Sequence, residues 1–209
     1  MVPLISVVIP TVPGRERYLG QAVAAYAAQA PGNYRLDLIV ERGHNSVGAA
    51  WQAGADKAAG EYLHLTNDDC EPHPGWHTAA LEAVERGFLP APQVFGPLGQ
   101  PQSLPQWGVT GDDWTPVSMA TIPFCSRAQW EKIGPLCLVH YYADDFFGYR
   151  GARAGWATVL RSGYAFTHKW AQEHRGAGMS EGDRMRFDLP QYQAARAMAE
   201  RGEWDKPWP

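Results

Sequence analysis

The stretch that decides the fold is Leu4-Ile5-Ser6-Val7-Val8-Ile9, which is followed by Pro10-Thr11. It is a nearly continuous run of apolar, mostly β-branched residues, and strands buried on both faces of a parallel sheet have this composition. Pro10 ends the run, because a proline cannot donate to a central sheet ladder. We therefore predict a buried parallel strand at the start of the chain.

Segments that favour helix and strand alternate after this first strand. The expected elements are a helix over 18–29, a strand over 36–40, a helix over 47–59 and a strand over 62–66. This β-α-β-α-β order predicts a mostly parallel central sheet flanked by helices, an α/β architecture. Ligands of such sheets bind at the carboxyl ends of the strands, so the residues after each strand have the greatest functional interest.

The second half of the chain has a weaker pattern. We expect helices over 77–86, 126–133 and 141–154, short strands over 157–160 and 164–167, and one amphipathic helix in the tail from Pro190. Segment 88–114 reads as loop with short strands, and 169–188 as a polar, mobile loop. Ser126 is the expected N-cap of the helix that follows it.

The amino-acid composition limits the kinds of protein that this chain can be. The 209 residues are enough for one domain with an ordinary core, and a net charge of −4 disfavours a polyanion partner held mainly by phosphate contacts. The three cysteines form no CxxC pair, so reduced thiols are expected. The first apolar run is too short to span a bilayer and lacks a basic flank, which predicts a cytoplasmic protein without a membrane span.

The turn Asn67-Asp68-Asp69 follows the strand expected over 62–66. Adjacent carboxylates at the end of a buried strand repel one another, and a bound divalent cation is a common physical reason to tolerate this. Their hard oxygen atoms suit Mg²⁺ or Mn²⁺. The alternative is a solvated polar turn, because Asn and Asp favour turns for local hydrogen-bonding reasons.

Three segments, taken in order, resemble family 2 glycosyltransferases: Ile5 to Thr11, Gly48 to Leu63, and the acidic turn with Pro74-Gly75-Trp76 after it. The resemblance covers about residues 4–168. It implies a single GT-A (Rossmann-like) domain over 1–189, with a donor half over about 1–90 and an acceptor half over about 91–189. Residues 190–209 would form a C-terminal helical tail.

The resemblance also implies the donor site. Pro10, Thr11 and Val12 match the family's first contact with the nucleoside, and Glu41 stands where an Asp is commoner. Asn67 and Asp68 match the positions near the nucleotide sugar, with Asn67 replacing the first Asp of the usual motif.

The remaining matches concern the metal and the catalytic base. Asp69 matches the direct metal ligand, and His168 matches the histidine that completes the metal site, with His174 as a second candidate. Asp144 matches the general base of inverting transfer, with Asp145 as the alternative. Ala143 replaces the usual Glu.

These matches predict a metal-dependent inverting glycosyltransferase that uses Mn²⁺ or Mg²⁺ and a nucleotide diphosphate sugar, with a UDP-sugar expected first. The acceptor carries a hydroxyl and is a saccharide, a protein or a modified nucleobase, with Trp107 and Trp114 as its expected contacts. A homo-oligomer could help to shape the acceptor pocket. Two alternatives stay open: a nucleotidyltransferase that makes a nucleotide sugar, and a catalytically degenerate module that only binds one.

Overall fold

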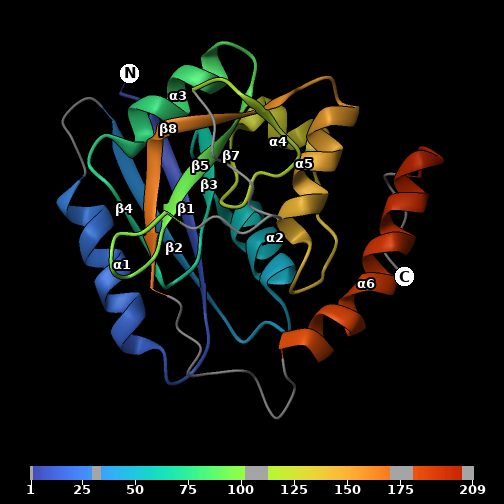
Figure 1. Ribbon diagram of the computed structural model, residues 1–209, viewed down its shortest axis with the longest axis horizontal. Helices are drawn as coiled ribbons and strands as arrows, with labels where there is room; N and C mark the ends of the chain where they lie inside the picture. Colours follow the sequence, from blue (N-terminus) through green and yellow to red (C-terminus); the bar gives the residue numbers. More distant parts are fainter. Residues whose placement is uncertain (1, 30–33, 102–112, 170–180, 204–209) are drawn as a thin grey trace.

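The computed structural model describes residues 2–29, 34–101, 113–169 and 181–203. Helices and strands alternate through the first half, as the sequence predicts, and the α/β class is confirmed (Figure 1). In chain order the elements are β1 (Leu4–Thr11), α1 (Glu16–Ala28), β2 (Arg35–Arg42), α2 (Val47–Lys57), β3 (Tyr62–Leu65), β4 (Cys70–Pro72), α3 (Trp76–Glu85), β5 (Leu89–Phe95), β6 (Pro116–Val117), β7 (Phe124–Ser126), α4 (Arg127–Ile133), α5 (Ala143–Arg153), β8 (Thr158–His168) and α6 (Glu181–Glu200).

The first sheet has the strand order β2-β1-β3-β7 and contains the opening strand at its centre. β1 pairs in parallel with both β2 and β3, while β7 is antiparallel to β3. Val7 of β1 belongs to the same core cluster as Tyr26 of α1, whereas Val8 packs with Trp51 of α2. Alternate β1 side chains therefore face different helices, which is why the run is apolar on both faces apart from Ser6.

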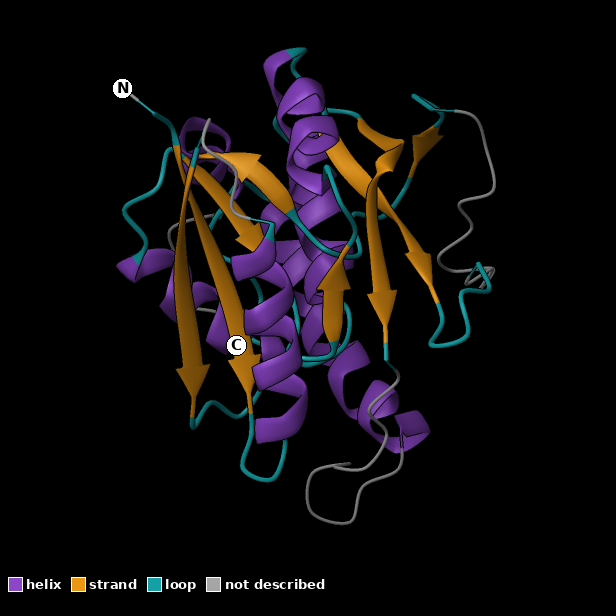
Figure 2. Ribbon diagram, turned by 90° about the vertical axis from the view of Figure 1, so that its left-hand side faces the viewer, coloured by secondary structure: helices purple, strands orange, loops and turns teal. Residues whose placement is uncertain are grey.

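The second sheet has the order β4-β8-β5, with β6 paired to the side of β8. Figure 2 shows the long strands of the two sheets at opposite sides of the view. β8 is one strand where the sequence predicted two, because β5 pairs with it on both sides of residues 162–164. β5 lies in the segment expected to be loop with short strands, and its register with β8 shifts between Pro92 and Gln93.

The acidic turn connects the two sheets. β3 ends at Leu65 in the first sheet, and β4 begins at Cys70 in the second, where it pairs antiparallel with the end of β8. The turn between them is closed by a hydrogen bond from the backbone N–H of Cys70 to the carbonyl of Asn67, 3.2 Å. The carboxyl end of β8 is thereby brought beside the carboxyl ends of β1 and β3.

A buried histidine lies in the core on the α1 side of the first sheet. His64 Nε2 lies 2.7 Å from the Tyr26 hydroxyl, and His64 Nδ1 lies 3.1 Å from the Tyr164 hydroxyl. Tyr164 donates its proton to the carbonyl of Ile122, 2.5 Å away, so it accepts from His64 Nδ1–H. Burial lowers the pKa of His64 to about 3, which keeps the ring neutral. It is a packing residue with both ring nitrogens satisfied.

The C-terminal helix α6 lies against α5, on the side of the molecule away from the second sheet (Figure 1). It begins at Glu181, so the expectation of a loop up to 188 and a helix starting at Pro190 was wrong. Pro190 lies inside the helix, where tertiary packing of Tyr192 and Ala195 overrides the local preference of proline for a helix start. Among the described residues, no helix is long and apolar enough to cross a membrane.

Candidate active site

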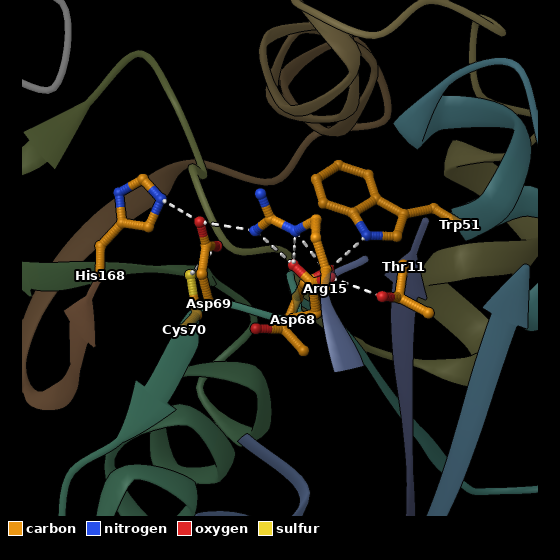
Figure 3. Close-up of polar contacts among 8 residues, drawn as sticks. Thr11, Arg15, Trp51, Asp68, Asp69, Cys70 and His168 are labelled. Atoms are coloured by element: carbon orange, nitrogen blue, oxygen red, sulfur yellow. Dashed lines mark hydrogen bonds and ion pairs between the residues drawn. The ribbon is translucent and has the colours of Figure 1, made fainter. Parts of the chain in front are cut away.

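Thr11 and Arg15 meet the acidic turn at the carboxyl end of β1 (Figure 3). Thr11 Oγ1 donates a hydrogen bond of 2.6 Å to Asp68 Oδ2. Arg15 Nε lies 2.9 Å and 3.0 Å from the two Asp68 oxygens, and Arg15 Nη2 lies 2.6 Å from Asp68 Oδ1. Asp68 is therefore fixed by two residues that lie 57 and 53 positions before it in the sequence, as expected where parallel strands end at one edge.

Asp69 is held from two sides. Its Oδ2 atom lies 2.9 Å from Arg15 Nη2 and 3.4 Å from His168 Nε2. Burial alone would raise the pKa of Asp69, but His168 and Arg15 together hold it well below its usual value. The carboxylate is therefore charged in spite of being buried.

The pairing of β4 with β8 sets the distance between Asp69 and His168. Cys70 and His168 are directly opposite in the antiparallel ladder, and the backbone N–H of Lys169 donates to the carbonyl of Asp69, 2.8 Å. Both side chains are thus positioned by backbone hydrogen bonds rather than by a flexible loop. Two side chains that bind one metal ion together need to be held in place in this way.

The donor set at this point fits a divalent cation. The ligand atoms of Asp69, Cys70 and His168 all lie within 4.8 Å of one another. Adjacent ligands of an octahedral cation, each about 2.1 Å from the metal, are about 3 Å apart, close to the 3.4 Å between Asp69 Oδ2 and His168 Nε2. The carboxylate and the imidazole suit Mn²⁺. Cys70 is buried, and burial raises the pKa of its thiol well above the usual value, so this sulfur is protonated.

The other residues expected at the nucleoside lie around this centre. Pro10 is half-buried, Val12 is exposed, and Asn67 is half-buried at the start of the acidic turn. The carbonyl of Val12 accepts the backbone N–H of Arg15, 3.3 Å, which shapes the turn that carries the arginine. Trp51 Nε1 donates a hydrogen bond of 2.8 Å to the carbonyl of Thr66, which fixes the backbone just before Asn67.

Glu41, at the end of β2, is buried and belongs to a separate charged group. Its carboxylate accepts hydrogen bonds from Lys57 Nζ at 2.7 Å and 3.0 Å, and it lies 2.9 Å from His44 Nε2. Burial would raise the pKa of Glu41, but Lys57 and His44 lower it. Glu41 is therefore a charged carboxylate that already has two hydrogen-bond partners.

Asp144 and Asp145 lie in the first turn of α5, where the helix dipole favours negative charge. Asp144 Oδ1 accepts the backbone N–H of Asp145, 3.0 Å. Burial and the neighbouring Asp145 carboxylate raise the pKa of Asp144 to about 7. Burial also raises the pKa of Asp145, although Arg196 of α6 opposes this. The first turn thus holds two carboxyl groups of perturbed acidity, a common property of catalytic pairs.

The loop before α5 is fastened to other elements. The backbone N–H of Gly48 donates to the carbonyl of Val139, 2.9 Å, and Ser46 Oγ donates to that of Leu138, 2.8 Å. A side chain at Gly48 would overlap the carbonyl oxygen of Cys137, so only glycine allows this approach. These contacts fix the N-terminus of α5 to that of α2.

The structure adds Arg15 to the site, which the sequence analysis missed. The available signal was a cation four positions after Thr11, at the end of the first strand. Trp114, expected at the acceptor, lies with its ring 3.8 Å from the Arg161 guanidinium and 4.5 Å from that of Arg86. His174 and Trp107 lie outside the described residues.

No protein-family model and no curated protein sequence matches the chain. Among solved structures, it is similar to GalNAc-T7 crystallised with UDP, GalNAc and Mn²⁺, with a TM-score of 0.67 and 12% identity over 100% of this chain and 53% of that one. It is also similar to S. aureus TarS (TM-score 0.60, 13% identity, 93% and 43% covered) and to TarS 1–349 in complex with UDP-GlcNAc (0.65, 14%, 93% and 66%).

The chain spans about half the length of GalNAc-T7 and of full TarS. Identities of 12–14% carry information about the fold and not about the substrates. The similarity extends over nearly the whole of this chain, including both sheets and the acidic turn between them. The chain therefore has the GT-A fold of these glycosyltransferases.

Proposed function

We propose that this protein is a metal-dependent glycosyltransferase that moves a sugar from a nucleotide diphosphate sugar to an acceptor hydroxyl with inversion. The observation that carries the proposal is the meeting of Asp68 and Asp69 with Thr11 and His168 at the joined ends of β1, β3 and β8. The GT-A fold supports it, since solved relatives in that fold were crystallised with UDP and Mn²⁺ or with UDP-GlcNAc.

The donor would bind at the carboxyl ends of the first sheet. Pro10, Thr11, Val12 and Glu41 are proposed to contact the nucleoside, with Asn67 and Asp68 next to the ribose and sugar. Thr11 and Asp68 are already fixed to one another, so this edge is pre-organised for a ligand. A UDP-sugar is the first donor to test, because both ligand-bound relatives carry a uridine diphosphate group.

Asp69 and His168 are the proposed metal ligands. A divalent cation held there would neutralise the charge that develops on the departing diphosphate. Mn²⁺ and Mg²⁺ both suit the carboxylate, and the imidazole favours Mn²⁺.

Asp144 is the proposed general base, with Asp145 as its alternative. The base removes the proton of the acceptor hydroxyl while the hydroxyl oxygen attacks the anomeric carbon from the side opposite the diphosphate. The bond from the anomeric carbon to the diphosphate oxygen breaks as the new glycosidic bond forms, and the configuration inverts. A carboxyl group with a pKa near 7 is well matched to this task at neutral pH.

The test uses the purified chain, Mn²⁺ and a panel of nucleotide sugars. We expect saturable UDP binding by calorimetry and slow release of UDP from the correct sugar donor. Asp144→Asn should abolish release with unchanged UDP affinity, while Asp56→Asn on the exposed face of α2 should change neither. If Asp145→Asn abolishes release instead, the alternative base is correct.

The same assays separate the competing functions. Release of pyrophosphate from a nucleoside triphosphate and a sugar phosphate would identify a nucleotidyltransferase. Donor binding without turnover in the unmodified protein, across the panel and with acceptors added, would identify a module that only binds. A cytoplasmic location, a homo-oligomeric state and the class of the acceptor remain predictions from the sequence.

A further inference from the structure

Arg15 occupies the position at which a cation would balance the acidic turn. Its guanidinium lies between the two carboxylates, with Nη2 2.6 Å from Asp68 Oδ1 and 2.9 Å from Asp69 Oδ2 (Figure 3). The Arg15 side chain is only 12% exposed. Burial disfavours the guanidinium charge, yet its contacts with Asp68 and Asp69 raise the pKa of Arg15 above its usual value. The repulsion between these carboxylates is therefore already offset within the chain.

This contact conflicts with metal binding at the same oxygen. Asp69 Oδ2 is the atom that lies toward both Arg15 and His168. A cation held by Asp69 and His168 would lie about 2.1 Å from its ligand atoms. A guanidinium 2.9 Å from the same oxygen would then face a divalent charge at close range in a site with little water. The Arg15–Asp69 ion pair therefore opposes the binding of a cation at this oxygen.

The backbone around Arg15 allows the side chain to leave. Arg15 is the residue before the first turn of α1, and its side chain does not cap that helix. The helix is held by its own buried face, including Leu19 and Tyr26, which pack into the core. Rotation of the Arg15 side chain therefore breaks its contacts with the acidic turn and leaves α1 in place.

We propose that Arg15 is an internal counter-ion which a divalent metal displaces from Asp69, and that the displaced guanidinium then binds the diphosphate of the donor. The proposal rests on the nucleotide-sugar site proposed above. A guanidinium presents a planar pair of N–H donors that matches phosphate oxygens, so a diphosphate provides the partner that Arg15 loses. Metal and nucleoside diphosphate must consequently bind cooperatively, each favouring the arrangement that accepts the other.

Calorimetric titrations of Mn²⁺ alone, UDP alone and each in the presence of the other test this inference. In the unmodified protein, we expect Mn²⁺ alone to bind weakly and its affinity to rise about tenfold when UDP is present. Arg15→Met should bind Mn²⁺ alone about tenfold more tightly than the unmodified protein, and should bind UDP in the presence of Mn²⁺ more weakly. A residue with only a structural role would not move these two affinities in opposite directions.

Three controls keep the result interpretable. Arg17→Met removes an exposed arginine in the first turn of α1 and should leave both affinities unchanged. Asp69→Asn should abolish Mn²⁺ binding, which verifies that the titrated ion occupies this site. Arg15→Gln removes the charge but keeps a hydrogen-bond donor, and should act in the same direction as Arg15→Met if the methionine variant folds poorly.

Equal Mn²⁺ affinity in the unmodified protein, Arg15→Met and Arg15→Gln would overturn the inference, as would tighter UDP binding by either variant. Failure of the unmodified protein to bind UDP, with or without Mn²⁺, would instead defeat the proposed function. The comparison of Mn²⁺ affinities needs no nucleotide, so the two failures can be told apart.

Discussion

Removal of the Asp188 carboxylate should loosen the N-terminus of α5. Asp188 of α6 is buried, and its Oδ2 accepts the backbone N–H groups of His140 and Tyr141 at 3.0 Å and 2.9 Å. These residues directly precede the turn into α5, where Asp144 and Asp145 lie. Asp188→Ala leaves both N–H groups without this acceptor while Tyr192 and Ala195 still pack α6 against α5.

The magnitude follows from the two hydrogen bonds. A hydrogen bond to a charged group contributes about 1.5–3 kcal/mol. His140 is exposed, so water can reach its N–H in the variant and recover part of the loss. We therefore expect Asp188→Ala to lower the free energy of unfolding by about 2–4 kcal/mol. Asp188→Asn can keep both hydrogen bonds through its single amide oxygen but loses the charge, and should lower it by about half as much.

Urea unfolding followed by tryptophan fluorescence measures this change, with Gln191→Ala, a half-buried neighbour on α6, as the control. A loss below about 0.5 kcal/mol for Asp188→Ala, within the range of an ordinary surface substitution, would refute the reasoning. In that case α6 would not hold the loop before α5. A second readout is transfer, which should fall in Asp188→Ala with UDP affinity unchanged, because only the carboxyl pair of α5 is disturbed.

Three further predictions concern acidity and packing. Since the pKa of Asp144 is raised to about 7, its base form increases with pH, so kcat/KM for transfer should rise up to about pH 7 and then level off; Asp145→Asn should move this midpoint to lower pH, and an unchanged midpoint in pH-rate profiles would contradict the assigned pair. His64 is neutral in the folded protein and has a pKa of about 3, whereas in the unfolded chain its pKa is about 6.5. Its contribution to the free energy of unfolding is therefore complete above pH 6.5 and falls by about 1.4 kcal/mol per pH unit as the pH drops toward 3. The difference between the urea midpoints at pH 7 and pH 5 should therefore be smaller in His64→Phe than in the unmodified protein. An equal difference in the two proteins would show that His64 does not cause the loss of stability at pH 5. Gly54→Ala places a methyl group against a valine of β1 and should cost about 1–3 kcal/mol, whereas Gly20→Ala, with open space at its Cβ position, should stabilise by about 0.5–1 kcal/mol; thermal unfolding distinguishes the two, and stabilisation by both would refute the packing argument.

The first half of the fold could be read from the sequence because its signals are local. The run Leu4 to Ile9 is apolar except for Ser6, whose buried hydroxyl accepts the N–H of Gly60, and a strand between two helix layers favours such a composition. Ser126 was identified as a helix cap from residue type alone, and its hydroxyl accepts the N–H of Gln129 in a capping box. Such features depend on neighbours within a few residues.

The second half was predicted less well because its elements depend on partners distant in sequence. β8 passes through Arg161 and Ser162, which read as a break, and its pairing with β5 on both sides of residues 162–164 makes it continuous. The start of α6 was misplaced at Pro190 for a similar reason, since most of the residues before the proline are polar or glycine. Contacts with α5 stabilise that helix, and they leave no pattern in its own sequence.

By itself, the sequence determined the α/β alternation, the position of the acidic turn after the third strand, and the physical need for a positive charge beside Asp68 and Asp69. Tertiary structure decided which charge lies there. Arg15 is distant from the acidic turn in sequence, and only the parallel pairing of β1 with β3 brings the two together. The antiparallel pairing of β4 with β8 likewise decided that His168 faces Asp69. Local composition encodes burial and turn formation, whereas the identity of an ion pair depends on where separate strands end.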